Sequence, residues 1–106
     1  MYLNQGDLSK AEEYLSQAEA ADPEFDGVHQ NLGLLYFQQK KYAQAENSWL
    51  KALALNPKLL KIHENLAVLY LQQNNLAKAV AQAKQVLEKG GQLQPQLQQA
   101  LQQYLK

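Results

Sequence analysis

The chain has 106 residues, in which ten Lys balance ten acidic residues, and it contains neither Arg nor Cys. This length supports a single domain, and the neutral, Arg-free composition argues against nucleic-acid binding, because proteins that bind nucleic acid concentrate Lys and Arg on one face to neutralise phosphates. The absence of Cys excludes a disulfide framework and a thiolate metal site.

The first residues of the chain contain no recognisable targeting signal. Met1 to Gly6 lack both the basic segment and the apolar core of a signal peptide. No apolar run approaches the roughly 18 residues of a membrane span. We therefore expect no membrane insertion and take the cytoplasm as the default location, although the sequence does not determine the compartment.

The composition predicts helix almost throughout. Ala, Leu, Gln, Lys and Glu are abundant, and all five are strong helix formers. Strand-favouring β-branched residues are limited to four Val and one Ile, with no Thr. We therefore predict an all-α fold.

Turn signals divide the chain into six predicted helices. In chain order these cover residues 8–21, 26–39, 42–55, 60–73, 76–89 and 94–106. Asp22-Pro23 and Asn56-Pro57 end two of the helices, because the residue before Pro is displaced from the helical region. Gly90-Gly91 provides a C-cap for a third, and Asp26 is a candidate N-cap for the helix that follows Pro23.

The sequence repeats with a period of 34 residues. Residues 28–36 (VHQNLGLLY) align with residues 62–70 (IHENLAVLY), and 11 of the 34 aligned pairs in the two units are identical. Each unit is predicted to form two helices joined by a polar turn. One unit cannot cover its own apolar stripes, so neighbouring units are expected to stack.

The repeated residues resemble the tetratricopeptide repeat (TPR), whose pattern is W-x2-L-G-x2-Y, then A-x3-F, then P. One unit reads His29-x2-Leu32-Gly33-x2-Tyr36, Ala45-x3-Trp49 and Pro57, all in register. The next reads His63-x2-Leu66-Ala67-x2-Tyr70 and Ala79, with Ala83 in place of the aromatic residue and Gly91 in place of the proline. The first unit keeps Tyr2, Ala11, Leu15 and Pro23.

The resemblance covers essentially the whole chain and implies a right-handed helical-repeat solenoid of stacked antiparallel helix pairs. Within a single domain over residues 1–106, it predicts a partial repeat over 1–25, repeats over 26–59 and 60–93, and a capping helix over 94–106. Small residues at Gly33 and Ala67 support this arrangement independently, because two helices that cross closely need small side chains at the crossing.

The chain offers no constellation that favours catalysis or a cofactor. His29 and His63 occupy equivalent places in neighbouring units, but neither has a second His three or four residues away, and there is no Cys to complete a zinc site. The family usually has a buried aromatic residue there, so we expect a packing role. Gly90-Gly91 lacks the preceding strand and the Lys of a phosphate-binding loop. We therefore predict that the protein is not an enzyme and that it binds neither a cofactor nor a metal.

The resemblance further implies that a peptide or helix of a partner protein binds in a concave groove lined by the first helix of each unit. Removing the packing stripe leaves these inner-face residues: Gln30, Asn31, Leu34, Phe37 and Gln38 in one unit, and Lys61, Glu64, Asn65, Val68, Leu71 and Gln72 in the next. Their apolar strip is flanked by amides, and such strips mark interaction sites. We therefore predict a protein-interaction scaffold.

Two more specific readings concern the ligand and the assembly. Asn31, Lys61 and Asn65 match part of the carboxylate clamp of some chaperone-cofactor members of the family, but Asn65 stands where the closing cation would be, so the match is incomplete. The alternative function is head-to-tail self-assembly, because Ala11 and Leu15 lack a covering helix at one end of the chain.

At the other end, the last predicted helix lacks a following helix to cover Leu97, Leu101 and Tyr104. Leu101 is bulky where Gly33 and Ala67 are small, and the outer face is rich in Gln. These two features favour a capped monomer over a homo-oligomer that packs end to end.

Overall fold

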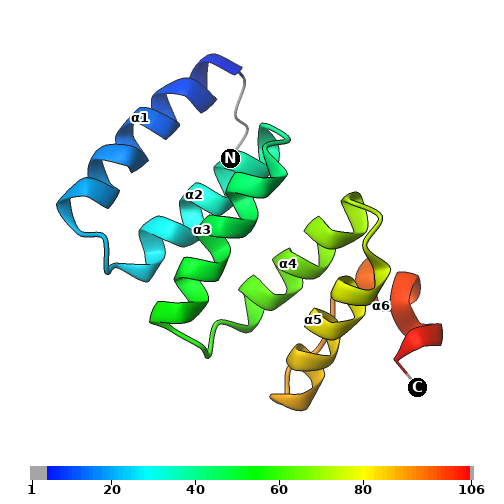
Figure 1. Cartoon of the computed structure of the whole chain (residues 1–106). Helices are drawn as coiled ribbons and strands as arrows, with labels where there is room; N and C mark the ends of the chain where they lie inside the picture. Colours follow the sequence, from blue (N-terminus) through cyan, green and yellow to red (C-terminus); the bar gives the residue numbers. More distant parts are fainter. Residues whose placement is uncertain (1–4, 106) are drawn as a thin grey trace. The chain divides into compact units, whose positions relative to one another are not determined.

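The computed structural model describes residues 5–105, with side chains from residue 9 onward, and the chain divides into two compact units between Lys58 and Leu59. Unit 1 contains α1 (Gln5–Ala21), α2 (Asp26–Gln38) and α3 (Tyr42–Leu55). Unit 2 contains α4 (Leu60–Gln72), α5 (Leu76–Glu88), α6 (Pro95–Leu101) and the 3-10 helix η1 (Gln102–Tyr104). Every regular element in the described range is a helix (Figure 1), which confirms the predicted all-α fold. No helix in this range combines the length and apolar character needed to cross a membrane.

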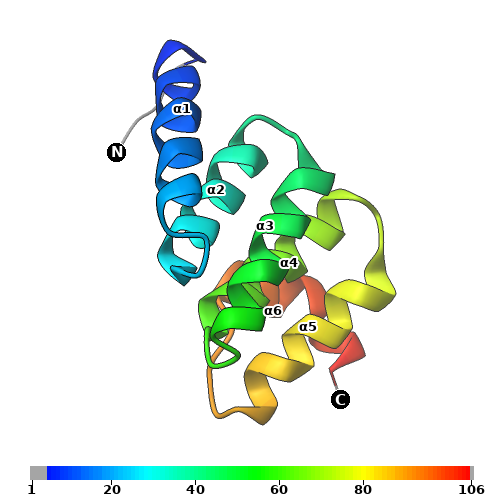
Figure 2. The ribbon, with the colours of Figure 1, turned by 60° about the vertical axis from the view of Figure 1, so that its left-hand side comes forward.

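Each unit contains one complete helix pair. In unit 1, α2 and α3 pack side by side, and α1 packs against α2 (Figures 1 and 2). In unit 2, α4 and α5 form the equivalent pair. Only three residues connect the helices of each pair, 39–41 in unit 1 and 73–75 in unit 2, and connections this short join antiparallel neighbours. The helical repeat expected from the 34-residue register is therefore present in both units.

Trp49 forms the centre of unit 1. Its side chain is 1% exposed, and its indole N–H donates to the carbonyl oxygen of Gln30 on α2 at 3.2 Å. Gly33 faces the indole ring so closely that a Cβ atom at this position would overlap it. Because the ring is fully enclosed and cannot move aside without opening the core, α2 and α3 can approach only with glycine at position 33.

In unit 2, two alanines lie at the equivalent helix crossing. Ala67 and Ala83 stand 34 residues after Gly33 and Trp49, and both are fully buried. Larger apolar side chains from both helices fill the space around them: Ile62, Leu66, Leu69, Tyr70 and Val86. The two units therefore differ at the crossing, with glycine and tryptophan in unit 1 and alanine and alanine in unit 2.

Three helices end in the same hydrogen-bond motif. At the end of α2, the N–H of Lys41 donates to the carbonyl of Tyr36 at 2.8 Å, which is the long-range bond of a Schellman motif. The motif requires one residue in the left-handed conformation. This residue is Lys40 after α2 (φ 61°), Asn74 after α4 (φ 59°) and Gly90 after α5 (φ 86°). Of the three, lysine tolerates positive φ least, because its Cβ crowds the backbone.

Apart from ends that differ by a single residue, the helix termini differ from the sequence-based expectation in three places. Helix α1 begins at Gln5, earlier than the expected residue 8. Asp26 does not cap α2; its carboxylate accepts a hydrogen bond from the Asn56 side chain at 3.1 Å, which ties the start of α2 to the end of α3. The last α-helix is shorter than the expected 94–106. It ends at Leu101 and tightens into the 3-10 helix η1, closed by a bond from the N–H of Leu105 to the Gln102 carbonyl.

The close contact at Gly33 predicts the outcome of adding a single methyl group. Gly33→Ala should lower the free energy of unfolding by about 1–3 kcal/mol through overpacking, although alanine is the better helix former. Gly27→Ala in the same helix is the matched control, because the three atoms nearest to its new Cβ all belong to the exposed ring of Phe25, which can move aside, and we expect no loss there. Urea unfolding followed by circular dichroism measures both variants. Equal stability of the two variants would contradict this account of the crossing.

The positive φ of Lys40 predicts a stabilising substitution. Lys40→Gly should raise the free energy of unfolding by about 1 kcal/mol, because glycine adopts the left-handed conformation without Cβ crowding. Asn74→Gly should change it less, since asparagine already tolerates this conformation. Thermal melting of both variants tests which substitution gives the larger gain in stability. A gain at Asn74 larger than that at Lys40 would count against the Schellman assignment.

Candidate interaction surface

Unit 1 contains an apolar groove between α1 and α2 with a volume of about 580 Å³. We call it the α1–α2 groove, and it is lined by Lys10, Ala11, Tyr14 and Leu15 of α1 and by Asn31, Leu34, Leu35 and Gln38 of α2. Tyr14 is 72% exposed and Leu34 is 49% exposed. Two large apolar side chains that line one hollow and remain this open to water form the kind of patch at which proteins bind one another.

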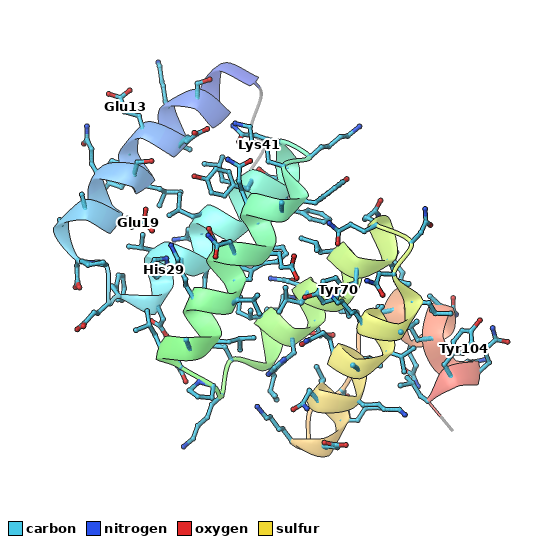
Figure 3. All side chains as sticks on the ribbon, viewed as in Figure 1. Glu13, Glu19, His29, Lys41, Tyr70 and Tyr104 are labelled. Carbon is cyan, nitrogen blue, oxygen red and sulfur yellow. The ribbon has the colours of Figure 1, made fainter. Side chains whose placement is uncertain are left out.

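One side of α1 places two carboxylates beside α2 and the turn that follows it. Glu12 accepts a hydrogen bond from the Gln39 side chain at 3.2 Å and lies 3.8 Å from the Lys41 ammonium group. Two turns further along α1, Glu19 lies 3.5 Å from Nδ1 of His29, and Figure 3 shows these two side chains facing each other. Because these contacts occupy the side of α1 that meets α2, the neighbouring stripe with Ala11 and Leu15 is left to form the wall of the groove.

Tyr36 lies close to these two carboxylates. Burial, and after it the negative charges of Glu12 and Glu19, raise the pKa of the Tyr36 phenol above its ordinary value. The phenol therefore stays protonated and neutral across the physiological range. The Tyr36 side chain therefore adds no negative charge beside Glu12 and Glu19.

Three of the five residues predicted on α2 line the groove, namely Asn31, Leu34 and Gln38. Gln30 is half-buried, and its carbonyl accepts the bond from Trp49. Phe37 lies elsewhere: its ring packs 5.8 Å from the indole of Trp49 and 5.5 Å from the ring of Tyr42, between centroids. The reason is geometric, because a residue four positions after Gly33 shares the helix face that packs against α3.

The six residues predicted on α4 have different environments. Lys61 and Gln72 are exposed, whereas Asn65, Val68 and Leu71 are half-buried. Glu64 is only 8% exposed, and its carboxylate accepts the backbone N–H of Gln94 at 2.8 Å, immediately before α6. Glu64 thus anchors the C-terminal segment of unit 2. No local pattern indicates this role, since its partner lies 30 residues away in the sequence.

The groove residues of α1 are not among the binding residues that the sequence predicts. The sequence predicts that Ala11 and Leu15 are uncovered, but the prediction does not include Lys10 and Tyr14. The 34-residue alignment of the repeats does distinguish Tyr14, because this residue aligns with Ser48 and Gln82 in the other units. A large aromatic residue in place of small or polar ones indicates a changed environment at that position.

The two equivalent histidines make different contacts. His29 Nε2 lies 2.7 Å from the Pro23 carbonyl, which can only accept, so this nitrogen donates. His63 instead uses Nδ1, 2.7 Å from Oε1 of Gln82, while its Nε2 lies 3.4 Å from the Lys89 ammonium group. Within the part of the chain that the structure describes, no three His, Asp or Glu side chains come together in a way that could hold a metal ion.

The apolar face of α6 is covered within the folded chain. Leu97 and Leu101, which were expected to lie open at the end of the solenoid, are both buried. Tyr104 remains partly exposed, at 41%. A second hollow of about 530 Å³ lies beside this segment, and it is lined by Leu87, Gln92, Leu93, Gln98, Gln102 and Leu105. The glutamines fit the solvated outer face expected of a capping segment.

The buried contact of Glu64 predicts a structural effect. Glu64→Ala should lower the free energy of unfolding by about 1.5–3 kcal/mol, because it leaves the N–H of Gln94 without its charged acceptor. Lys61→Ala, at an exposed position one turn earlier on α4, serves as the control and should change stability little. Chemical unfolding of both variants tests whether Glu64 has this structural role. Unchanged stability of the Glu64 variant would contradict it.

Family models of known proteins match successive stretches of the chain. One described as a tetratricopeptide repeat matches residues 2–48, one described as a TPR repeat matches residues 33–74, and another tetratricopeptide-repeat model matches residues 64–92. No curated protein matches the chain. Repeats of this family generally mediate protein–protein interaction as non-enzymatic scaffolds. With the 34-residue register and the helix pairs of both units, these matches show that the chain belongs to the tetratricopeptide-repeat family.

Proposed function

We propose that this protein is an interaction scaffold that binds an apolar segment of a partner protein in the α1–α2 groove. The observation that carries the proposal is the joint exposure of Tyr14 and Leu34 across one hollow of unit 1. Covering these two side chains removes apolar surface from water, which is the main favourable term in protein association. Both lie on helices, so the groove wall is already in place before a partner arrives.

The polar groups of the groove indicate the chemistry of the partner. Asn31 and Gln38 provide amide donors and acceptors along the α2 wall, and Lys10 is the one charged residue among the described side chains, from residue 9 onward, that line the hollow. A groove with one positive charge selects its ligand chiefly by shape and apolar contact. The affinity should therefore change little between low and physiological salt, because screening acts on charged groups.

The exposed and half-buried residues of α4 provide a second proposed contact surface, in unit 2. Asn65, Val68 and Leu71 are half-buried, so each retains surface that a partner could cover. Glu64 is not included, because its carboxylate is already bonded to Gln94. Substitutions in unit 1 and in unit 2 test the two surfaces separately.

The experiment selects peptides from a displayed random library on the full chain and then compares variants. Tyr14→Ser and Leu34→Ser should each weaken binding of the selected peptides by about 10- to 30-fold, the effect of removing a good apolar anchor. Both side chains are exposed enough that folding should be unaffected. Affinities are measured by fluorescence anisotropy, and circular dichroism checks the fold.

Two controls separate the groove from the rest of the surface. Leu50→Ser removes an exposed leucine from α3 (45% exposed), outside the groove. Glu13→Ser alters the side of α1 that points away from α2 (Figure 3). Neither should change the affinity. If the groove variants and the controls weaken binding equally, the groove is not the binding surface.

A further inference from the structure

His29 of α2 lies almost completely inside unit 1, and the two groups beside its ring accept hydrogen bonds. The residue is 3% exposed. Nε2 lies 2.7 Å from the carbonyl oxygen of Pro23, in the turn between α1 and α2, and Nδ1 lies 3.5 Å from Oε2 of Glu19 on α1 (Figure 3). A carbonyl oxygen and an ionised carboxylate both accept, and neither donates. The ring therefore lies between two acceptors, one beside each nitrogen.

A neutral imidazole can donate to only one of these acceptors, because it has one N–H and one nitrogen with a lone pair. The Pro23 carbonyl takes the N–H at Nε2, so the lone pair at Nδ1 then faces the carboxylate of Glu19, and among the described residues Nδ1 has no hydrogen-bond partner. The imidazolium form has an N–H on each nitrogen. Burial disfavours a charge unless it is paired and hydrogen-bonded, and here a counter-ion and two acceptors are in place. The geometry therefore fits the charged ring.

The charges that face this ring come from α1 and α3. Glu19 is the contact from α1, and Lys51 of α3 lines a hollow of about 290 Å³ together with His29 and Glu19. Lys51 is exposed, so water and salt screen its ammonium group. Tyr36 of α2, whose phenol pKa is raised by burial and by nearby carboxylates that include Glu19, remains neutral. We therefore expect the carboxylate of Glu19 to have the larger effect on the charge of the ring.

The equivalent histidine of unit 2 has the opposite surroundings. Nε2 of His63 lies 3.4 Å from the ammonium group of Lys89, which can only donate, so this nitrogen accepts. Nδ1 then carries the proton and donates to Oε1 of Gln82 at 2.7 Å. The neutral ring satisfies both neighbours, and a positive charge on it would face the ammonium group. The same position of the repeat thus fits a neutral ring in unit 2 and a charged ring in unit 1.

We propose that His29 and Glu19 form a proton-operated latch, which holds the end of α1 against α2 more firmly when the ring is charged. The two residues are on different helices, so the carboxylate stays beside the ring only while α1 is packed against α2. The packed arrangement therefore binds a proton at His29 more readily than an arrangement in which α1 has moved away. By thermodynamic linkage, packing of α1 gains stability as the pH falls and loses this gain as the pH rises.

Hydrogen exchange of the full chain, followed by NMR, tests the latch without any partner. Between about pH 7.5 and pH 5.5, histidine is the side chain that ordinarily changes its charge. Protection factors of the α1 amides, corrected for the intrinsic effect of pH on exchange, should rise about fivefold over this fall in pH, because a charge-assisted hydrogen bond forms across a partly exposed pair. The amides of α4 and α5 should show no such rise, since the surroundings of His63 favour the neutral ring.

Three variants assign the effect to the pair. Glu19→Gln keeps the size of the side chain, but its amide can donate to the neutral ring as readily as it accepts from the charged one, so the rise in protection should nearly disappear. His29→Gln removes the titrating group and should abolish the rise. Glu13→Gln is the matched control, because it removes a carboxylate from the side of α1 that points away from α2 (Figure 3), and it should leave the rise unchanged.

The charge of the ring gives a second readout, which does not require that His29→Gln folds. Long-range nitrogen–proton NMR spectra distinguish a ring protonated on both nitrogens from a neutral one. The signals of the doubly protonated His29 ring should appear at a higher pH in the unaltered chain than in Glu19→Gln. A His29 ring that stays neutral at about pH 5.5 would overturn the latch, and so would a rise in α1 protection that persists in Glu19→Gln. None of these results depends on peptide binding in the α1–α2 groove.

Discussion

The close crossing of the two helices in each pair is the constraint on which the rest of this structure depends. In unit 1, Gly33 allows the backbone of α2 to approach the enclosed indole of Trp49, and the indole in turn bonds to the Gln30 carbonyl. Phe37 then fills the space one turn further along. A larger residue at position 33 would separate the helices and open each of these contacts, because a closely packed core transmits local displacement.

The two units of the repeat differ at the helix crossing and in the contacts of the equivalent histidines. The crossing is formed by glycine and tryptophan in unit 1 and by alanine and alanine in unit 2. The equivalent histidines, His29 and His63, bond through different ring nitrogens to partners of different kinds. The period of the repeat therefore preserves the pairing of the helices, while the residues at the crossing and the polar partners of each position differ between the units.

The α1–α2 groove follows from the same packing rules. Helix α1 presents one side to α2, where Glu12 accepts a hydrogen bond from Gln39 and Glu19 lies beside His29, and it leaves the stripe with Ala11 and Leu15 partly open. In the other copies that stripe is sealed by the first helix of the pair. The equivalent positions of α1 are half-buried in unit 1, next to the exposed side chains of Tyr14 and Leu34.

The sequence by itself determined the fold class, the helix pairs and the small residues at the crossings. These features depend on spacings of three to four residues and on a 34-residue period, and both can be read from one chain. It also predicted that Asn31, Leu34 and Gln38 lie on the exposed face of their helix, because this face follows once the packing stripe is known. It did not determine whether Phe37 would lie on the exposed face or in the packing stripe. A residue at the edge of the stripe can belong to either.

Only the tertiary structure decided the roles of Glu64, α6 and α1. Glu64 is bonded to a backbone group 30 residues away, and Leu97 and Leu101 are covered in the folded chain, although an isolated last helix would leave them open. Tyr14 became part of a groove only when α1 was placed against α2. Contacts between distant segments depend on how whole helices pack, and the local periodicity of a helix records which face is apolar but not which neighbour will cover it.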